Sequence, residues 1–111
     1  MNGLHHATRH VAIARGLGKV IVTVHGRLDR DTVPAVEETL VGLARDGGFD
    51  AVIIDLRDVS FLDGRGLGLL VDGSEMFGGQ GREFVLSGPT PSVRKALDRN
   101  PAVKNLHVNP P

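Results

Sequence analysis

The sequence predicts a single α/β domain built around a mostly parallel central sheet. Three observations lead to this prediction: short β-branched or uniformly apolar runs that suit buried strands, amphipathic stretches with helical spacing between them, and glycine or proline at their boundaries. In chain order these features give strand, strand, helix, strand, helix, strand, helix, strand. Strands that alternate with helices require crossover connections, which place neighbouring strands parallel.

The first two strands are expected to form an antiparallel hairpin. KVIVTVHG, residues 19–26, is rich in β-branched side chains and ends on glycine, which favours a buried strand. Residues 11–14 are also apolar and precede it across Gly16-Leu17-Gly18. We therefore expect an N-terminal strand that pairs antiparallel with its successor.

The later strands alternate with helices. AVIIDL, residues 51–56, is short and uniformly apolar, as in strands covered on both faces. REFVLSG at 82–88 predicts the next strand, and residues 106–108 predict a last short one. The expected helix caps are Asp31 or Thr32, Asp63, and Thr90 with proline in the first turn. The apolar positions of the three helices are Val33, Val36, Leu40 and Leu43; Leu67, Leu70, Val71 and Phe77; and Val93, Ala96 and Leu97.

Composition narrows the possible functions. Thirteen basic and thirteen acidic side chains balance, and the chain lacks Trp, Tyr and Cys. We therefore expect no nucleic-acid partner and no thiol chemistry. No cofactor is expected either, because the sequence has no complete nucleotide-binding pattern and no metal-ligand cluster. No apolar run reaches membrane-spanning length, and residues 1–15 lack the continuous apolar segment of a secretory signal. We therefore expect a cytoplasmic protein with no membrane partner.

The domain is expected to cover residues 11–111, with residues 1–10 as a flexible polar leader. The leader contains His5, His6 and His10, but its neighbourhood supplies no further metal ligands. No metal site is expected there. The segment that follows the strand at 51–56 is also rich in glycine, and such a segment before a helix can bind phosphate. A G-x-G-x-x-G pattern that starts at Gly64 would, however, need glycine where Leu69 stands.

A second interpretation of this region is an aspartyl phosphoacceptor. Asp55 would end a central strand, much as in a Mg²⁺-dependent receiver domain. Such a site needs further carboxylates, because Mg²⁺ takes oxygen ligands. The simpler expectation is that Asp55 ends a strand, Asp58 makes a turn and Asp63 caps a helix. The receiver remains an alternative.

A third interpretation comes from a family resemblance. VHGRLD at 24–29, VIIDLRDVSFLDGRGLGLLV at 52–71 and FVLSGPTPSVRKAL at 84–97 resemble the STAS domain, specifically the bacterial anti-sigma factor antagonists. The similarity covers nearly the whole chain after about residue 11. It implies a regulator of transcription that binds a serine-kinase-like anti-sigma factor and thereby frees a sigma factor, and it implies no catalytic activity.

The resemblance also assigns roles around the central motif. Asp63 matches the motif aspartate, and Gly66, Leu67 and Gly68 match the segment after it. Family members typically carry two small hydroxyl residues between these, and the second takes phosphate from the partner kinase. Gly64 and Arg65 stand at those two positions. Arginine has no hydroxyl and keeps its charge, so this site is predicted not to be switched by phosphorylation.

Several alternatives follow from Arg65. It either contributes to a permanently competent antagonist, blocks a standard partner, or is simply solvated. A displaced phosphosite at Ser60, Ser74 or Ser87 is a further alternative. The predicted partner-binding residues are those of the motif together with charged residues after the strand ends: Arg27, Asp29, Arg57, Asp58, Asp63, Gly64, Arg65, Gly66 and Leu67.

The assembly state is also left open by the sequence. The family usually has a helix after the last strand, whereas NLHVNPP ends in two prolines. A less covered sheet edge would favour self-association, so a homodimer is one expectation. A scaffold subunit of a stress-signalling assembly is the alternative to a one-to-one antagonist.

Overall fold

The computed structural model describes residues 10–103 and 106–109. The strands are β1 (Val11–Gly16), β2 (Lys19–Leu28), β3 (Ala51–Leu62), β4 (Glu83–Ser87) and β5 (His107–Asn109). The helices are α1 (Val33–Arg45), α2 (Gly64–Gly79) and α3 (Pro91–Asp98), followed by the 3-10 turn η2 (Pro101–Val103). The predicted order of elements is confirmed. Apart from His10, the predicted leader and its histidines lie outside the described residues.

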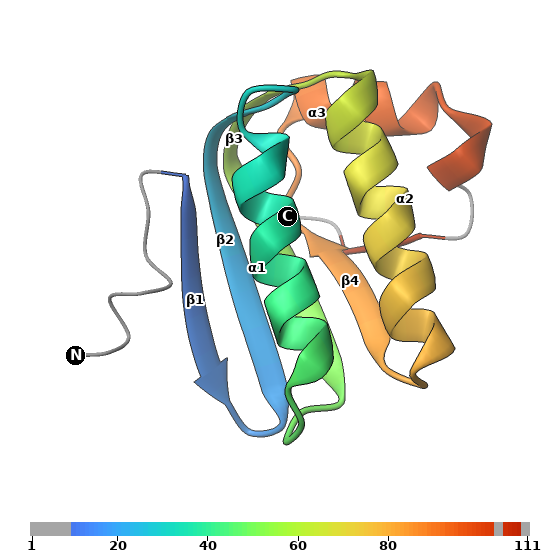
Figure 1. Cartoon of the computed structure of the whole chain (residues 1–111). Coiled ribbons are helices and arrows are strands. Elements are labelled where there is room, and N and C mark those ends of the chain that lie inside the picture. Colours follow the sequence, from blue (N-terminus) through green and yellow to red (C-terminus); the bar gives the residue numbers. More distant parts are fainter. Residues whose placement is uncertain (1–9, 104–105, 110–111) are drawn as a thin grey trace.

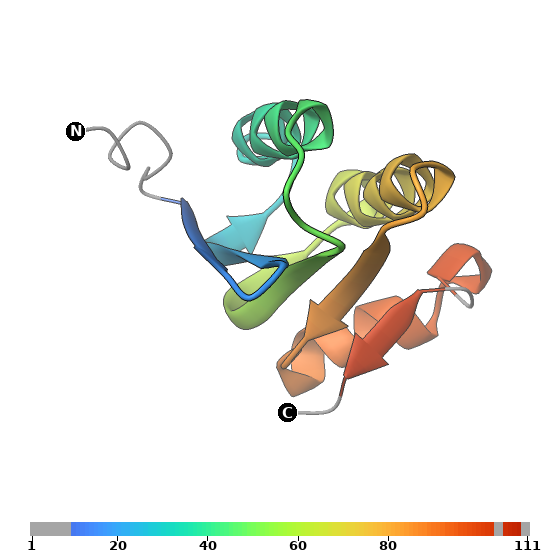
Figure 2. The same ribbon diagram turned by 90° about the horizontal axis from the view of Figure 1, so that it is seen from below.

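The five strands form one sheet in the order β1-β2-β3-β4-β5. β1 pairs antiparallel with β2, and all other neighbours are parallel. α1 and α2 lie on one face of this sheet and α3 lies on the other (Figures 1 and 2). This is the predicted α/β domain with a mostly parallel sheet and an N-terminal antiparallel strand.

The core lies between the sheet and the pair α1 and α2. Alternate side chains of the strands, such as Val22 and Ile54, are fully buried, as β-branched residues in a covered sheet should be. Phe77 of α2 is also fully buried and stacks on Phe84 of β4, with 5.9 Å between ring centroids. This packing fixes α2 across the sheet and so fixes where the helix begins.

β3 is longer than predicted and has no turn after residue 56. Its pairing with β2 shifts register twice, and at each shift β3 contributes one residue more than β2. After Leu56 the buried residues therefore recur every third position, at Val59 and Leu62. The expectations that Asp55 ends a strand and Asp58 makes a turn are wrong, because β-bulges break the alternation without ending the strand.

The predicted helix caps meet different outcomes. Asp63 and Thr90 cap α2 and α3, since each side chain accepts an N–H from the residue three positions later. Thr32 precedes α1 but makes no side-chain cap bond. Its hydroxyl instead donates to the Arg27 carbonyl at 2.7 Å, and so ties the start of α1 to the end of β2. The starts of α1 and α2 thus lie at the same end of the sheet, where β2 and β3 end.

Candidate functional site

The candidate site is the beginning of α2, where β3 delivers the chain directly into a helix. Asp63 is the single residue between the two elements. Its Oδ1 accepts the N–H of Gly66 at 2.9 Å, and its carbonyl accepts the N–H of Leu67 at 2.9 Å. The first of these bonds satisfies one of the otherwise unpaired N–H groups at the helix start, and the second is the first backbone hydrogen bond of the helix. The predicted motif aspartate has a well-defined structural role.

Gly66 holds the start of α2 against the end of β2. A Cβ on this residue would overlap the carbonyl oxygen of Leu28 and would come within 2.8 Å of the Leu62 side chain. Asp63 reinforces this contact, because its N–H donates to the same Leu28 carbonyl at 3.3 Å. Only glycine allows so close an approach of helix and strand.

Gly64 and Gly68 have no comparable constraint. A Cβ built on either residue would meet nothing within 4 Å, apart from chain neighbours and the backbone of the helix itself. Arg65, between them, is exposed. Within residues 10–103 and 106–109, no acidic side chain forms an ion pair with it. The outer side of this first turn therefore presents two bare glycines and an uncompensated cation.

Arg57 is held very differently, although it stands on the same end of the sheet. Its Nε and Nη2 donate to the two carboxylate oxygens of Asp55 at 3.1 and 2.8 Å, and its backbone N–H donates to Asp55 Oδ1 at 3.0 Å. These hydrogen bonds, led by that of the guanidinium, lower the pKa of the buried Asp55 carboxyl. Gly88 leaves room for the Arg57 side chain, which a Cβ there would strike.

This pairing bears on the receiver alternative. Both carboxylate oxygens of Asp55 accept hydrogen bonds from Arg57, and Asp55 is only 7% exposed. Among the residues described, no three His, Cys, Asp or Glu side chains cluster as metal ligands would. A carboxylate held this way stabilises the sheet end and is not presented to a phosphodonor or to Mg²⁺.

Three further contacts complete the rim at the ends of β2 and β3. His25 Nδ1 lies 3.2 Å from Asp58 Oδ2. Arg27 Nε donates to Asp29 Oδ2 at 3.0 Å, and this hydrogen bond is the main cause that lowers the pKa of Asp29. The guanidinium of Arg27 also lies over the ring of Phe61, 4.1 Å from its centroid.

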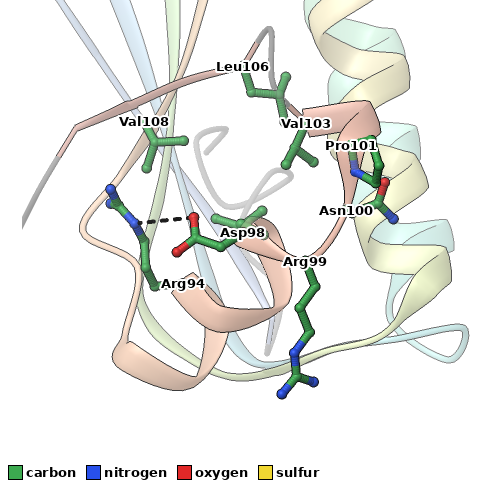
Figure 3. A pocket seen from close by; sticks show the side chains of 9 residues that line it. Arg94, Asp98, Arg99, Asn100, Pro101, Val103, Leu106 and Val108 are labelled. Carbon is green, nitrogen blue, oxygen red and sulfur yellow. Dashed lines mark ion pairs between the residues drawn. The ribbon is translucent and has the colours of Figure 1, made fainter.

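Hollows flank the start of α2 and the end of α3. One of about 210 Å³ adjoins Gly64, and its lining includes the apolar residues Leu62 and Leu67 and the basic residue Arg99. A larger one, about 390 Å³, lies among α3, η2 and β5 (Figure 3). Figure 3 shows the ion pair of Arg94 with Asp98 beside this larger hollow, while Arg99 points away from it. Only the smaller hollow touches the motif.

The predicted site residues fall at one end of the sheet. Arg27 lies in β2, Asp29 follows it, Arg57 and Asp58 lie in β3, and the motif residues open α2. Of the candidate displaced phosphosites, Ser60 is exposed on β3, whereas Ser74 and Ser87 are half-buried. Gly64, Gly66 and Leu67 lie on the first turn of α2, with Leu67 buried and Gly64 exposed.

The sequence analysis missed three residues of this rim: His25, Phe61 and Gly88. Asp55 and Arg57 are two positions apart on one strand, which is a readable signal for a pair on one face. The contacts of His25 and Phe61 cross between strands and depend on the two register shifts of β3. No pattern within one segment of the sequence could have indicated them.

None of the described helices combines the length and the apolar character that crossing a membrane requires. This finding concerns residues 10–103 and 106–109.

The comparisons with known proteins agree with the fold. The STAS domain family model matches residues 10–110. The anti-sigma-B factor antagonist of Staphylococcus aureus is 32% identical over 88 residues, which are 79% of this chain and 81% of the relative. An anti-sigma factor antagonist from Mycobacterium paratuberculosis superimposes with a TM-score of 0.82 at 27% identity, covering 91% of this chain and 85% of that one.

The unphosphorylated anti-sigma factor antagonist SpoIIAA has the same fold, with a TM-score of 0.75 at 19% identity. The superposition covers 89% of this chain and 87% of SpoIIAA. The expected resemblance is confirmed by the family match over nearly the full chain and by the identity to a curated relative. The protein belongs to the STAS domain family.

Proposed function

We propose that this protein is an anti-sigma factor antagonist, a binding protein without catalytic activity that captures a serine-kinase-type anti-sigma factor and so frees a sigma factor. The names of its relatives support this class of function. The observation that carries the proposal is the outer side of the first turn of α2. Gly64, Arg65 and Gly68 are exposed or half-buried there, without any packing that would explain them.

Gly64 and Gly68 lower the stability of the helix, and no close contact in the fold requires either of them. Glycine inside a helix is about 0.5 to 1 kcal/mol less favourable than alanine. Gly66 repays this cost by its contact with β2, whereas Gly64 and Gly68 face open space. A partner that approaches the helix backbone closely explains why both positions lack a side chain. The small hollow beside Gly64 would then accept an apolar group of that partner.

Arg65 defines how this antagonist would be regulated. By the family resemblance it occupies the position of the phosphoacceptor, yet it offers no hydroxyl. A phosphate there would add a charge of about −1.5 to −2 to a close interface, and this charge would oppose docking. With arginine in its place, the partner kinase cannot end the interaction at this site. We therefore propose an antagonist that stays competent for binding in the presence of ATP.

The test compares the wild-type protein with Arg65→Ser. Each is mixed with purified anti-sigma factors of its bacterial host, and complexes are measured by size-exclusion chromatography before and after ATP is added. The wild type is expected to stay bound, whereas Arg65→Ser is phosphorylated and released. Arg15→Ser is the matched control, because Arg15 is an exposed arginine of β1, away from α2, and pairs with Asp46. A wild type that binds none of these proteins would refute the proposal.

A further inference from the structure

The stacked pair of Arg27 and Phe61 lies at the same corner of the molecule as the start of α2. The two residues are direct partners in the pairing of β2 with β3, and the next pair, Leu28 with Leu62, leads to Asp63. The Leu28 carbonyl in turn contacts the start of α2 through Asp63. Arg27 and Phe61 are thus one residue pair away from the proposed docking turn.

Phe61 is an exception among the aromatic residues of the chain. Of the four phenylalanines, Phe49, Phe77 and Phe84 are at most 6% exposed, whereas Phe61 is 38% exposed. The second register shift of β3 leaves both Ser60 and Phe61 on the surface. An aromatic ring held at the surface by a bulge offers a partner a large contact area at low conformational cost.

Arg27 is oriented but not saturated. Its Nε donates to Asp29, and the face of its guanidinium lies 4.1 Å from the Phe61 ring centroid. Asp29 is itself fixed, since its other oxygen accepts the N–H of Asp31 at 3.0 Å. The terminal Nη groups of Arg27 donate to no group of the described residues, and its side chain is 60% exposed. A guanidinium fixed in this way points an open pair of N–H donors toward solvent.

We propose that Arg27, stacked on Phe61, is the specificity-determining contact of the docking surface and receives a carboxylate side chain of the partner protein. This inference rests on the proposed function. A carboxylate matches the planar fork of arginine with two parallel hydrogen bonds, which an ammonium cannot reproduce. Because Asp29 and Phe61 hold the fork before the partner arrives, little side-chain entropy is lost on binding.

The shape of this corner favours a protein side chain over a small ligand. Small molecules bind in concave sites that bury most of their surface. Neither the hollow at the start of α2 nor the one behind α3 includes Arg27 or Phe61. An exposed pair that lines neither hollow suits a protein interface, where aromatic residues and arginines are typical anchors.

The experiment measures the affinity of the full-length protein for the host anti-sigma factor that it binds, by titration calorimetry. Arg27→Lys keeps the charge but removes the fork, and Phe61→Leu keeps apolar bulk but removes the aromatic face. We expect Arg27→Lys to weaken binding about tenfold and Phe61→Leu about threefold. Arg15→Lys, at the surface pair with Asp46, should stay within about twofold of wild type. Thermal unfolding establishes that each variant is folded.

A second arm identifies the carboxylate. Each surface Glu and Asp of the anti-sigma factor is changed to Gln or Asn, and one change should cost wild type about tenfold but cost Arg27→Lys almost nothing further. The inference is overturned if wild type binds its partner and both variants bind within about twofold of it. That result would leave the proposed function intact. If wild type binds no anti-sigma factor, the proposed function fails, and this inference fails with it.

Discussion

The inner and outer faces of α2 differ in what surrounds their glycines. On the inner face, a Cβ on Gly66 would overlap the end of β2, and a Cβ on Gly73 would lie 2.8 Å from the Phe84 ring. On the outer face, Gly64 and Gly68 have open space where a side chain would be. The fold therefore explains the inner glycines and leaves the outer ones unexplained. One helix thus carries glycines that the fold requires and glycines that only the proposed partner would explain.

The largest expected effect is that of Gly66→Ala. The added methyl must displace a strand carbonyl that also accepts the N–H of Asp63, so neither element can move freely. We expect the free energy of unfolding to fall by about 3 kcal/mol, even after the gain in helix propensity. Urea unfolding followed by circular dichroism measures this. A loss below about 1 kcal/mol would mean that α2 can shift on the sheet, and the contrast between its faces would weaken.

Gly73→Ala should have a smaller effect of the same sign. Its methyl would press on the Phe84 ring, which is a side chain but is stacked on Phe77 with ring centroids 5.9 Å apart. The ring can move only by loosening that stack, so we expect a net loss of about 1 kcal/mol. Urea unfolding measures this loss of unfolding free energy as well. Combining Gly73→Ala with Phe84→Leu should recover part of it. Failure to recover it would place the strain elsewhere.

The sequence predicts the inner face better than the outer one. The caps Asp63 and Thr90 were predictable because a cap bonds to N–H groups within three residues along the chain. The burial of Leu67, Leu70 and Phe77 follows from helical spacing in the same way. The difference between Gly66 and Gly68 was not predictable, because it depends on where β2 ends in space.

The second half of β3 shows the same limit. Its two bulges change the spacing of buried residues from two to three, so residues after Leu56 look like a turn in the sequence. The register that follows decides that Arg27 faces Phe61 and that His25 faces Asp58. Bulges depend on pairing between strands, and a single strand sequence does not reveal them.

Gly68→Ala should reverse the sign of the stability effect. The new methyl meets nothing, and alanine is the better helix former, so the protein should gain up to about 1 kcal/mol. The same methyl should weaken binding to the anti-sigma factor, because it stands where the partner is proposed to approach the backbone. Unfolding and titration calorimetry on one preparation measure both quantities. A variant that is more stable and binds as wild type would remove the functional explanation for this glycine.

The smallest expected effect extends the contrast from glycines to arginines. Arg57 lowers the pKa of Asp55, so folded Asp55 binds its proton less readily than in the unfolded chain. Their pair therefore stabilises the fold above about pH 4, and this contribution is lost as the pH falls through the lowered pKa. Arg57→Gln should be less stable than wild type at pH 7, and the curves of unfolding free energy against pH should converge in acid for the two proteins.

Arg65→Gln should follow wild type at every pH, because Arg65 has no acidic partner among the described residues. A parallel offset for Arg57→Gln down to pH 2 would show that its stem packed against Gly88, and not its charge, supports the sheet end.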